Sequence, residues 1–254
     1  MVMSAPVTKS HVVVIGVFDG VHKGHQELLN RAKAIADGRE IIALTFDPHP
    51  TTVFAPDRAP SMLTTLPDRV ELLKIHGADQ VAVMKFNEKF AAMSPEDFVK
   101  GILVDQLKAS TVIVGKNFTY GFKAAGNVDS LITSAKTHNF TVDAQELNSD
   151  NGEVISSSRI RALVHEGNVE DARLLLGRPH RLDGVVIHGE KRGREIGYPT
   201  ANLGNIDGQT IPADGVYAGW LTVGINFWPA AISIGTNPTF EGERGRQVEA
   251  YALD

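Results

Sequence analysis

The chain has 254 residues, of which 43% are hydrophobic and 22% are charged, and its formal net charge is -5 at pH 7. This length suits one large or two modest domains, and the acidic balance does not indicate a nucleic-acid surface. The absence of cysteine excludes disulfides and thiolate metal sites; since no apolar run approaches about 20 residues and residues 1–10 lack a signal-peptide core, we expect a cytoplasmic protein without membrane partners.

Up to residue 147, apolar runs alternate with helical patterns. The strand candidates are residues 11–17, 40–46, 80–84, 111–114 and 140–146, and the helix candidates are residues 23–36, 67–76, 95–107 and 128–137. A proline followed by an acid, as at Pro67-Asp68 and Pro95-Glu96, is typical of a helix start. The alternation predicts an α/β domain with a doubly wound parallel sheet, which binds ligands beyond the carboxyl ends of its strands.

The pattern changes after a pair of short helices predicted in residues 156–176. The remaining apolar runs alternate, are separated by glycine-rich turns and show no clear helix; they lie at residues 184–188, 215–223, 229–234 and 248–253. This pattern predicts a small antiparallel β-barrel or β-sandwich. We therefore expect two domains, residues 1–180 and residues 181–254.

The most informative motif is G-V-F-D-G-V-H-K-G-H at residues 16–25, between a buried strand and a helix start. Glycines allow the backbone to approach a phosphate, the helix start offers free N–H groups, and His22 and His25 can donate to a charged oxygen. The spacing differs from that of the dinucleotide and Walker loops. H-x-G-H is typical of nucleotidyltransferases, although two histidines taken alone could be surface residues at a helix end.

Three further segments would meet this turn at the carboxyl edge of a parallel sheet. They are T-F-D-P-H-P at residues 45–50, V-G-K-N-F-T-Y-G at residues 114–121 and I-S-S-S-R-I-R at residues 155–161. The serines and arginines of the third segment suit a triphosphate at a helix start. Taken alone, the serines could also be an ordinary helix cap, and the prolines a rigid loop.

These four segments, in this order, resemble the N-terminal adenylyltransferase module of prokaryotic bifunctional riboflavin kinase/FAD synthetase. The family patterns G-x-F-D-G-V-H-x-G-H, F-x-P-H-P and S-S-T-x-I-R match residues 16–25, 46–50 and 156–161, with Ser158 in place of threonine. The pattern V-G-x-D-F-x-F-G matches residues 114–121, with Asn117 for aspartate and Tyr120 for phenylalanine. Both substitutes keep hydrogen-bonding capacity, so we expect altered details of binding rather than its loss.

The resemblance implies that FMN attacks the α-phosphorus of ATP, giving FAD and pyrophosphate, with Mg2+ bridging the phosphates. It implies that His22 and His25 are catalytic and contact the phosphates in the transition state. The residues implied in ATP or phosphate binding are Gly16, Phe18, Asp19, Gly24, Asn117, Ser157, Ser158 and Arg161. Flavin contacts are implied for Phe46, Pro50, Phe54 and again Asn117, since a flat ring system suits apolar walls.

A second constellation joins the base-rich loop at residues 189–195 to P-T-A-N at residues 199–202. Cationic, glycine-rich backbone suits phosphate, and a hydroxyl with an amide carbonyl suits Mg2+. Taken alone, these segments could be a solvated charged turn and a turn after proline.

The order of these features resembles riboflavin kinase, a six-stranded barrel. The patterns G-x-P-T-A-N, G-V-Y-x-G, A-I-S-x-G-x-N-P-T-F and V-E-x-x-x-L-D match residues 197–202, 215–219, 231–240 and 248–254. The resemblance implies phosphate contacts for Lys191 and Arg192, and Mg2+ and phosphate contacts for Thr200 and Asn202. It also implies that Glu249, which could otherwise be an exposed strand carboxylate, accepts the proton of the riboflavin 5′-hydroxyl.

The chain ends inside the last matching strand, whereas the family continues with a loop and a C-terminal helix. We therefore expect either a fragment or an incomplete kinase half, whose kinase activity is in question. Three functions stay open: conversion of riboflavin to FMN and then FAD, nucleotidyl transfer to another acceptor, and binding of flavin or nucleotide without turnover. The second domain favours the first, since residues 199–202 with 215–219 are not expected in other nucleotidyltransferases. The sequence does not indicate an oligomeric state.

Overall fold

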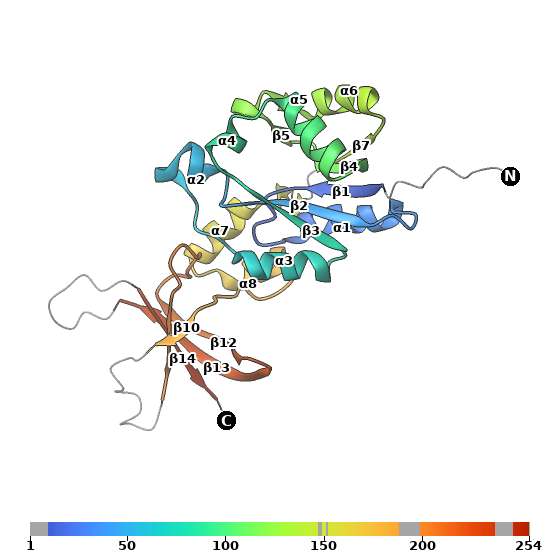
Figure 1. Cartoon of the computed structure of the whole chain (residues 1–254). Helices are drawn as coiled ribbons and strands as arrows, with labels where there is room; N and C mark the ends of the chain where they lie inside the picture. Colours follow the sequence, from blue (N-terminus) through green and yellow to red (C-terminus); the bar gives the residue numbers. More distant parts are fainter. Residues whose placement is uncertain (1–9, 147–148, 151, 188–198, 237–245, 254) are drawn as a thin grey trace. The chain divides into compact units, whose positions relative to one another are not determined.

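The computed structural model describes residues 10–146, 149–150, 152–187, 199–236 and 246–253. The chain divides into two compact units (Figure 1). The first unit contains residues 1–60 and 66–157, and the second contains residues 61–65 and 158–254. Among the described residues, no helix combines the length and apolarity needed to cross a membrane.

The first unit is built on a five-stranded parallel sheet with the order β3-β2-β1-β4-β7. Its strands are β1 (His11–Ile15), β2 (Ile41–Asp47), β3 (Gln80–Lys85), β4 (Ala109–Gly115) and β7 (Thr141–Gln145). Each strand lies where an apolar run predicted it. From β1 the chain adds β2 and then β3 on one side, and it then adds β4 and β7 on the other side of β1. The direction of winding therefore reverses between β1 and β4, and parallel sheets bind ligands beside the carboxyl ends of the strands at such a point.

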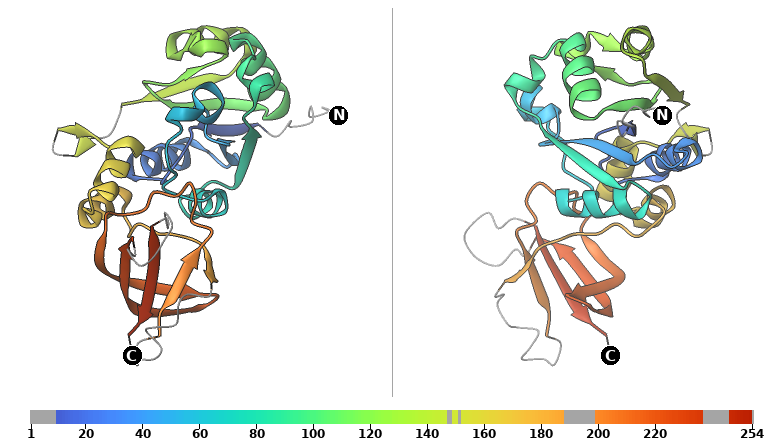
Figure 2. Two further views of the ribbon diagram at one scale, coloured as in Figure 1. Left: turned by 90° about the vertical axis from the view of Figure 1, so that its left-hand side faces the viewer. Right: turned by 45° about the vertical axis from the view of Figure 1, so that its right-hand side comes forward.

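Helices cover both faces of this sheet (Figures 1 and 2). Helices α1 (Lys23–Ile35) and α3 (Leu66–Ile75) contribute to one hydrophobic cluster with the sheet. The opposite face is covered by α5 (Pro95–Asp97), by its π-helical continuation η2 (Phe98–Gln106) and by α6 (Val128–His138). The predicted helices are therefore confirmed, with α5 and η2 together forming the one expected at residues 95–107.

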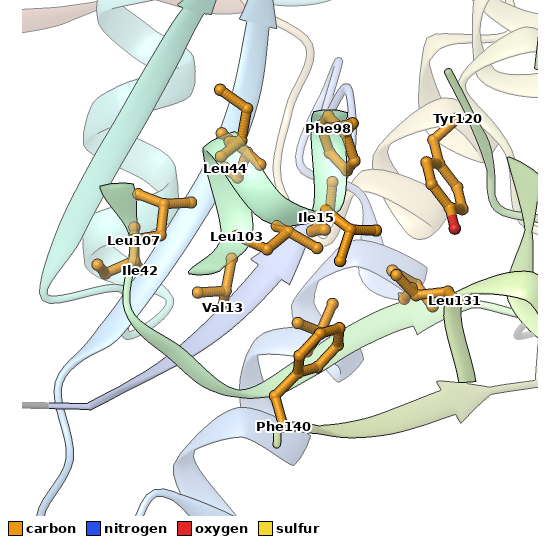
Figure 3. Close-up of a cluster of buried hydrophobic side chains, with 14 of the residues drawn as sticks. Val13, Ile15, Ile42, Leu44, Phe98, Leu103, Leu107, Tyr120, Leu131 and Phe140 are labelled. Carbon is orange, nitrogen blue, oxygen red and sulfur yellow. The ribbon is translucent and has the colours of Figure 1, made fainter. Parts of the chain in front are cut away.

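Strand β1 shows why the sheet forms from unbroken apolar runs. Successive side chains of a strand point to opposite faces, so Val12 and Val14 join the cluster of α1 and α3. Val13 and Ile15 join the opposite cluster, with Phe98 among its members (Figure 3). Because both faces are covered, the four buried residues of this strand, Val12 to Ile15, are all apolar.

Short elements connect these layers, and none of them was predicted. They are α2 (Thr51–Phe54), η1 (Pro56–Arg58), α4 (Glu88–Ala91), β5 (Thr119–Tyr120), η3 (Phe122–Ala124), β6 (Gly126–Asn127), β8 (Ser149–Asp150) and β9 (Glu153–Val154). Strands β5 and β6 pair with each other, as do β8 and β9.

The helix pair expected at residues 156–176 is confirmed as α7 (Ser157–His165) and α8 (Val169–Leu176). Helix α8 ends at Gly177, whose φ of 76° is the left-handed conformation that glycine adopts without a Cβ clash.

The second unit contains a five-stranded antiparallel sheet with the order β10-β11-β14-β13-β12. Its strands are β10 (Val185–Ile187), β11 (Ala201–Gly204), β12 (Gly215–Val223), β13 (Asn226–Gly235) and β14 (Gln247–Ala252). Four of them match predicted runs, and β11 was not expected as a strand. Buried Ile206, Ile234 and Val248 form a small core in this unit.

Residues 61–65 belong to the second unit although they lie between two elements of the first in sequence. The Met62 amide donates to the Gly208 carbonyl (2.7 Å), and the Thr210 amide donates to the Met62 carbonyl (2.8 Å). The Ser61 and Thr210 hydroxyls lie 3.0 Å apart, within hydrogen-bonding distance. These hydrogen bonds to distant segments explain why residues 61–65 belong to the second unit, which no local sequence pattern indicated.

Candidate active sites

The turn after β1 is held by a buried aromatic ring. Phe18 is fully buried in the hydrophobic cluster that α1 and α3 form with the sheet, and its φ of 56° lies in the left-handed region. A Cβ on Gly16 would lie 2.9 Å from this ring, so the ring occupies space that only glycine leaves open. Phe18, which was predicted to contact ATP, therefore has only its backbone available for that contact.

The two histidines of the motif lie together at the start of α1. Their rings stack with centroids 3.6 Å apart, and His25 also meets the Phe18 ring edge-on at 5.1 Å. A Cβ on Gly24 would lie 3.2 Å from the His22 ring, so this glycine makes room for the stack. The two predicted residues are therefore adjacent, and their catalytic role stays a prediction.

Burial determines the charge of His25. Desolvation, with a smaller contribution from neighbouring His22, holds the pKa of His25 well below its ordinary value of 6.5. Its Nδ1 is buried and has no hydrogen-bond partner among the residues that the structure describes. At neutral pH the side chain is therefore an uncharged imidazole with an uncommitted ring nitrogen.

A serine connects this turn to helix α7. The Ser157 hydroxyl donates to the backbone carbonyl of buried Asp19 (2.8 Å), so two of the four predicted segments meet. Ser158 is exposed and Arg161 is half-buried; both follow in α7 and belong to the second unit.

The predicted flavin-binding residues differ in exposure. Phe46 is buried in the core, with its ring against Phe86 and Phe90, whereas Phe54 is 55% exposed and its ring contacts Phe86 at 5.4 Å. Only Phe54 of these rings thus presents a large exposed aromatic surface. Half-buried Pro50 precedes α2, and Asn117 is exposed in the loop after β4. Phe86 and Phe90 were not singled out in the sequence.

A buried arginine outside all of the predicted motifs lies close to the ends of β1 and β2. Arg69, in α3, is 1% exposed, and its Nη1 donates to the carbonyls of Val17 and Phe46, both at 3.0 Å. Its Nη2 lies 3.5 Å from Asp47 Oδ1. Burial lowers the pKa of Arg69, and the charges of Asp19 and Asp47 oppose that shift. Its position one turn before buried Leu73, on the inner face of the predicted helix, is the signal that could have found it.

The second candidate site lies across neighbouring strands. Asn202 of β11 stands directly opposite Glu249 of β14, and Glu249 stands opposite Ser233 of β13. Directly opposed residues share a face of the sheet. The Thr200 hydroxyl, just before β11, donates to Glu249 Oε2 (3.2 Å). Three predicted residues are thus together; Ser233 was not predicted, and Lys191 and Arg192 lie outside the described residues.

Two family models match successive parts of the chain. A family model described as FAD synthetase matches residues 4–159, and one described as riboflavin kinase matches residues 176–254. A crystal structure described as a macrolide-efflux protein from Streptococcus pneumoniae is 33% identical, with a TM-score of 0.85 over 99% of this chain and 81% of that one.

Curated relatives carry both activities in their names. Proteins from Bacillus subtilis, Listeria monocytogenes and Escherichia coli are 37%, 40% and 35% identical over 248 residues. Each match covers 96% of this chain and 78% of the relative, which is named bifunctional riboflavin kinase/FMN adenylyltransferase. The resemblance found in the motifs is thus confirmed: the chain belongs to the family of bifunctional riboflavin kinase/FMN adenylyltransferases.

Proposed function

We propose that the domain predicted at residues 1–180 carries the FMN adenylyltransferase activity and the domain predicted at residues 181–254 the riboflavin kinase activity, so that together they convert riboflavin to FMN and FMN to FAD. The observation that carries the proposal is the stacked pair His22 and His25 at the carboxyl end of β1. Family membership supports flavin cofactor biosynthesis as the overall role, with ATP, riboflavin and FMN as substrates.

In the adenylyl step, an oxygen of the FMN phosphate bonds to the α-phosphorus of ATP. The bond from that phosphorus to the bridging oxygen breaks, and pyrophosphate leaves. The protein has to align these groups and stabilise the charge on their oxygens. His22 and His25 are the residues we assign to that charge, because imidazole N–H groups can donate to phosphate oxygens.

The remaining predicted contacts of this step stay proposals. The backbones of Gly16, Phe18 and Gly24 approach the phosphates, and Asp19 supports them by holding Ser157. We assign Ser157, Ser158 and Arg161 to the β- and γ-phosphates and Asn117 to a phosphate of either substrate. Phe54 and Pro50 contact the flavin ring, whereas buried Phe46 supports them from the core.

In the kinase step, Glu249 accepts the proton of the riboflavin 5′-hydroxyl as this oxygen attacks the γ-phosphorus of ATP. The bond between that phosphorus and the bridging oxygen breaks and ADP leaves. The hydrogen bond from Thr200 and the position of Asn202 opposite Glu249 support a shared site for these residues. Lys191 and Arg192 stay predicted phosphate contacts.

Mg2+ is part of this proposal at both sites. The hydroxyl of Thr200 and the amide carbonyl of Asn202 are hard oxygen ligands of the kind that this ion prefers. The described residues contain no cluster of three or more His, Cys, Asp or Glu side chains that could hold a metal. With few protein ligands, Mg2+ would be held largely by the phosphates of ATP, and the bound ion would neutralise part of their charge.

We further infer the nucleotidyltransferase fold of the H-x-G-H type for the parallel sheet and a riboflavin-kinase-like barrel for the antiparallel sheet. The domain boundary between residues 180 and 181 stays a prediction, as do a cytoplasmic location and the absence of nucleic-acid and membrane partners.

The test is an assay of each step with the purified chain. With FMN, ATP and Mg2+ we expect FAD and equimolar pyrophosphate; with riboflavin in place of FMN we expect FMN first. Pantetheine phosphate and nicotinate mononucleotide serve as competing acceptors. Failure to form FAD from FMN overturns the adenylyltransferase assignment. Pyrophosphate release only with another acceptor favours a different nucleotidyltransferase, and flavin binding without turnover favours a carrier.

A further inference from the structure

We propose that Arg69 is a positioning residue for adenylyl transfer: it holds the backbone after β1 and balances acidic charge where the triphosphate binds. The inference rests on the proposed adenylyltransferase function. Arginine is rarely buried unless other groups pair with its charge. Arg69 is among the largest fully buried side chains of the described residues.

The hydrogen bonds of Arg69 join two strand ends. Its Nη1 donates to the carbonyls of Val17, just after β1, and Phe46, near the end of β2. The hydroxyl of fully buried Thr45 also donates to the Val17 carbonyl (2.8 Å), so Val17 is held from two sides. The position of the turn relative to β2 thus depends on this guanidinium.

Phe18 links the hydrogen-bonded Val17 to the proposed catalytic pair. Val17 precedes Phe18, whose buried ring meets His25 edge-on at 5.1 Å, and His25 stacks on His22. A shift of the Val17 carbonyl would move the Phe18 ring and with it both imidazoles. Because phosphate transfer requires close alignment, such a shift lowers the rate.

The charge of Arg69 is the second part of the argument. Asp19 is 1% exposed and Asp47 is partly exposed, and both interact electrostatically with the guanidinium. Loss of that charge would remove the positive charge that opposes these two carboxylates, near the edge that has to accept polyanionic ATP. Like charges in a partly desolvated site disfavour binding of the substrate.

The chain supplies a matched control at the opposite edge of the sheet. Arg39, just before β2, donates to the carbonyls of Ile35 and Ala36 and to the hydroxyls of Ser110 and Thr111. Loss of this guanidinium removes a comparable set of hydrogen bonds from the amino ends of the strands. A purely structural role for Arg69 predicts that both arginines behave alike.

The experiment compares wild type, Arg69→Met, Arg69→Lys, Arg39→Met and the double variant Arg69→Met/Asp47→Asn. Rates of FAD formation are measured against ATP and FMN concentration, at a temperature where thermal unfolding shows each variant folded. For Arg69→Met we expect kcat/KM for ATP to fall about 100-fold, as misplacement of reacting groups can cost. For Arg39→Met we expect a lower Tm with kcat/KM within about threefold of wild type.

The other variants separate position from charge. Arg69→Lys keeps the positive charge but loses the planar guanidinium with its several fixed donors. We therefore expect a KM for ATP near that of wild type and a kcat about tenfold lower. Asp47→Asn in the Arg69→Met background removes an uncompensated carboxylate, so we expect KM for ATP to recover about threefold or more.

Equal kinetic effects of Arg69→Met and Arg39→Met would overturn the inference, and so would Arg69→Met with wild-type kcat/KM. If Arg69→Met does not fold, a wild-type kcat for Arg69→Lys overturns it. Failure of the proposed function is distinguishable, because wild type itself would then form no FAD.

Discussion

The two candidate sites are assembled in different ways. At the carboxyl edge of the parallel sheet, His22 and His25 come from a turn whose backbone is held by buried Phe18 and Arg69. In the antiparallel sheet, Asn202 and Glu249 stand in the strands themselves, and their proximity follows from register. The first site therefore depends on packing beneath a loop, whereas the second depends on strand pairing, in which a slip of one residue would turn Glu249 to the other face.

The sharpest way to separate the sites is His25→Ala. We expect kcat for FAD formation to fall about 1,000-fold and ATP affinity less than tenfold, because the imidazole acts mainly on charge in the transition state. Pyrophosphate release and ATP titration measure the two quantities, and phosphorylation of riboflavin should not change. His138→Ala, at the end of α6, is the control. Equal losses of rate and affinity would instead indicate a binding protein without turnover.

The reciprocal change is Glu249→Gln. We expect phosphorylation of riboflavin to fall about 100-fold through loss of the general base, while FAD formation from supplied FMN stays at its wild-type rate. The amide oxygen can still accept the hydrogen bond of Thr200, so the local structure is preserved. Kinase activity within twofold of wild type would rule out Glu249 as the base.

A smaller effect is expected at the flavin contact. Phe54→Ala removes an exposed ring, and we expect KM for FMN to rise about tenfold with little change in kcat, since the ring contacts substrate and transition state alike. Exposed Phe122 gives the matched control Phe122→Ala. An unchanged KM for FMN would remove Phe54 from the flavin site.

The smallest expected effect is on stability as a function of pH. His25 has a folded-state pKa well below 6.5, so between that lowered pKa and 6.5 the unfolded chain binds a proton that the folded chain does not. Stability is thus fully present above about pH 6.5 and falls as the pH decreases, by at most about 1.4 kcal/mol per pH unit. The free energy of unfolding, measured with urea between about pH 5.5 and 7.5, should change less steeply with pH in His25→Gln than in the wild type. Parallel curves for the two proteins would contradict the burial of His25 as a neutral group.

Much of the fold could be predicted because its signals are local. The strands of the parallel sheet contain apolar runs, as β1 illustrates with Val12, Val13, Val14 and Ile15, and two of the helices begin with a recognisable proline and acid. The order of the motifs also predicted the family. Strand β11 was missed because Ala201–Gly204 is short and weakly apolar, and its pairing with β14 depends on a segment more than forty residues away.

The sequence by itself determined the order of the longer helices and of the strands of the parallel sheet, and it indicated most residues of both candidate sites, because periodicity and motifs are encoded locally. Only the tertiary structure decided which of these residues are buried. It placed Phe46 in the core and left Phe54 exposed, although both are phenylalanines for which flavin contacts were predicted. It also buried Arg69, although arginine is a residue type that is mostly exposed. The physical reason is that desolvating a side chain is favourable or costly only in relation to its neighbours, and for Arg69 these are the carbonyls of Val17 and Phe46 at two distant strand ends.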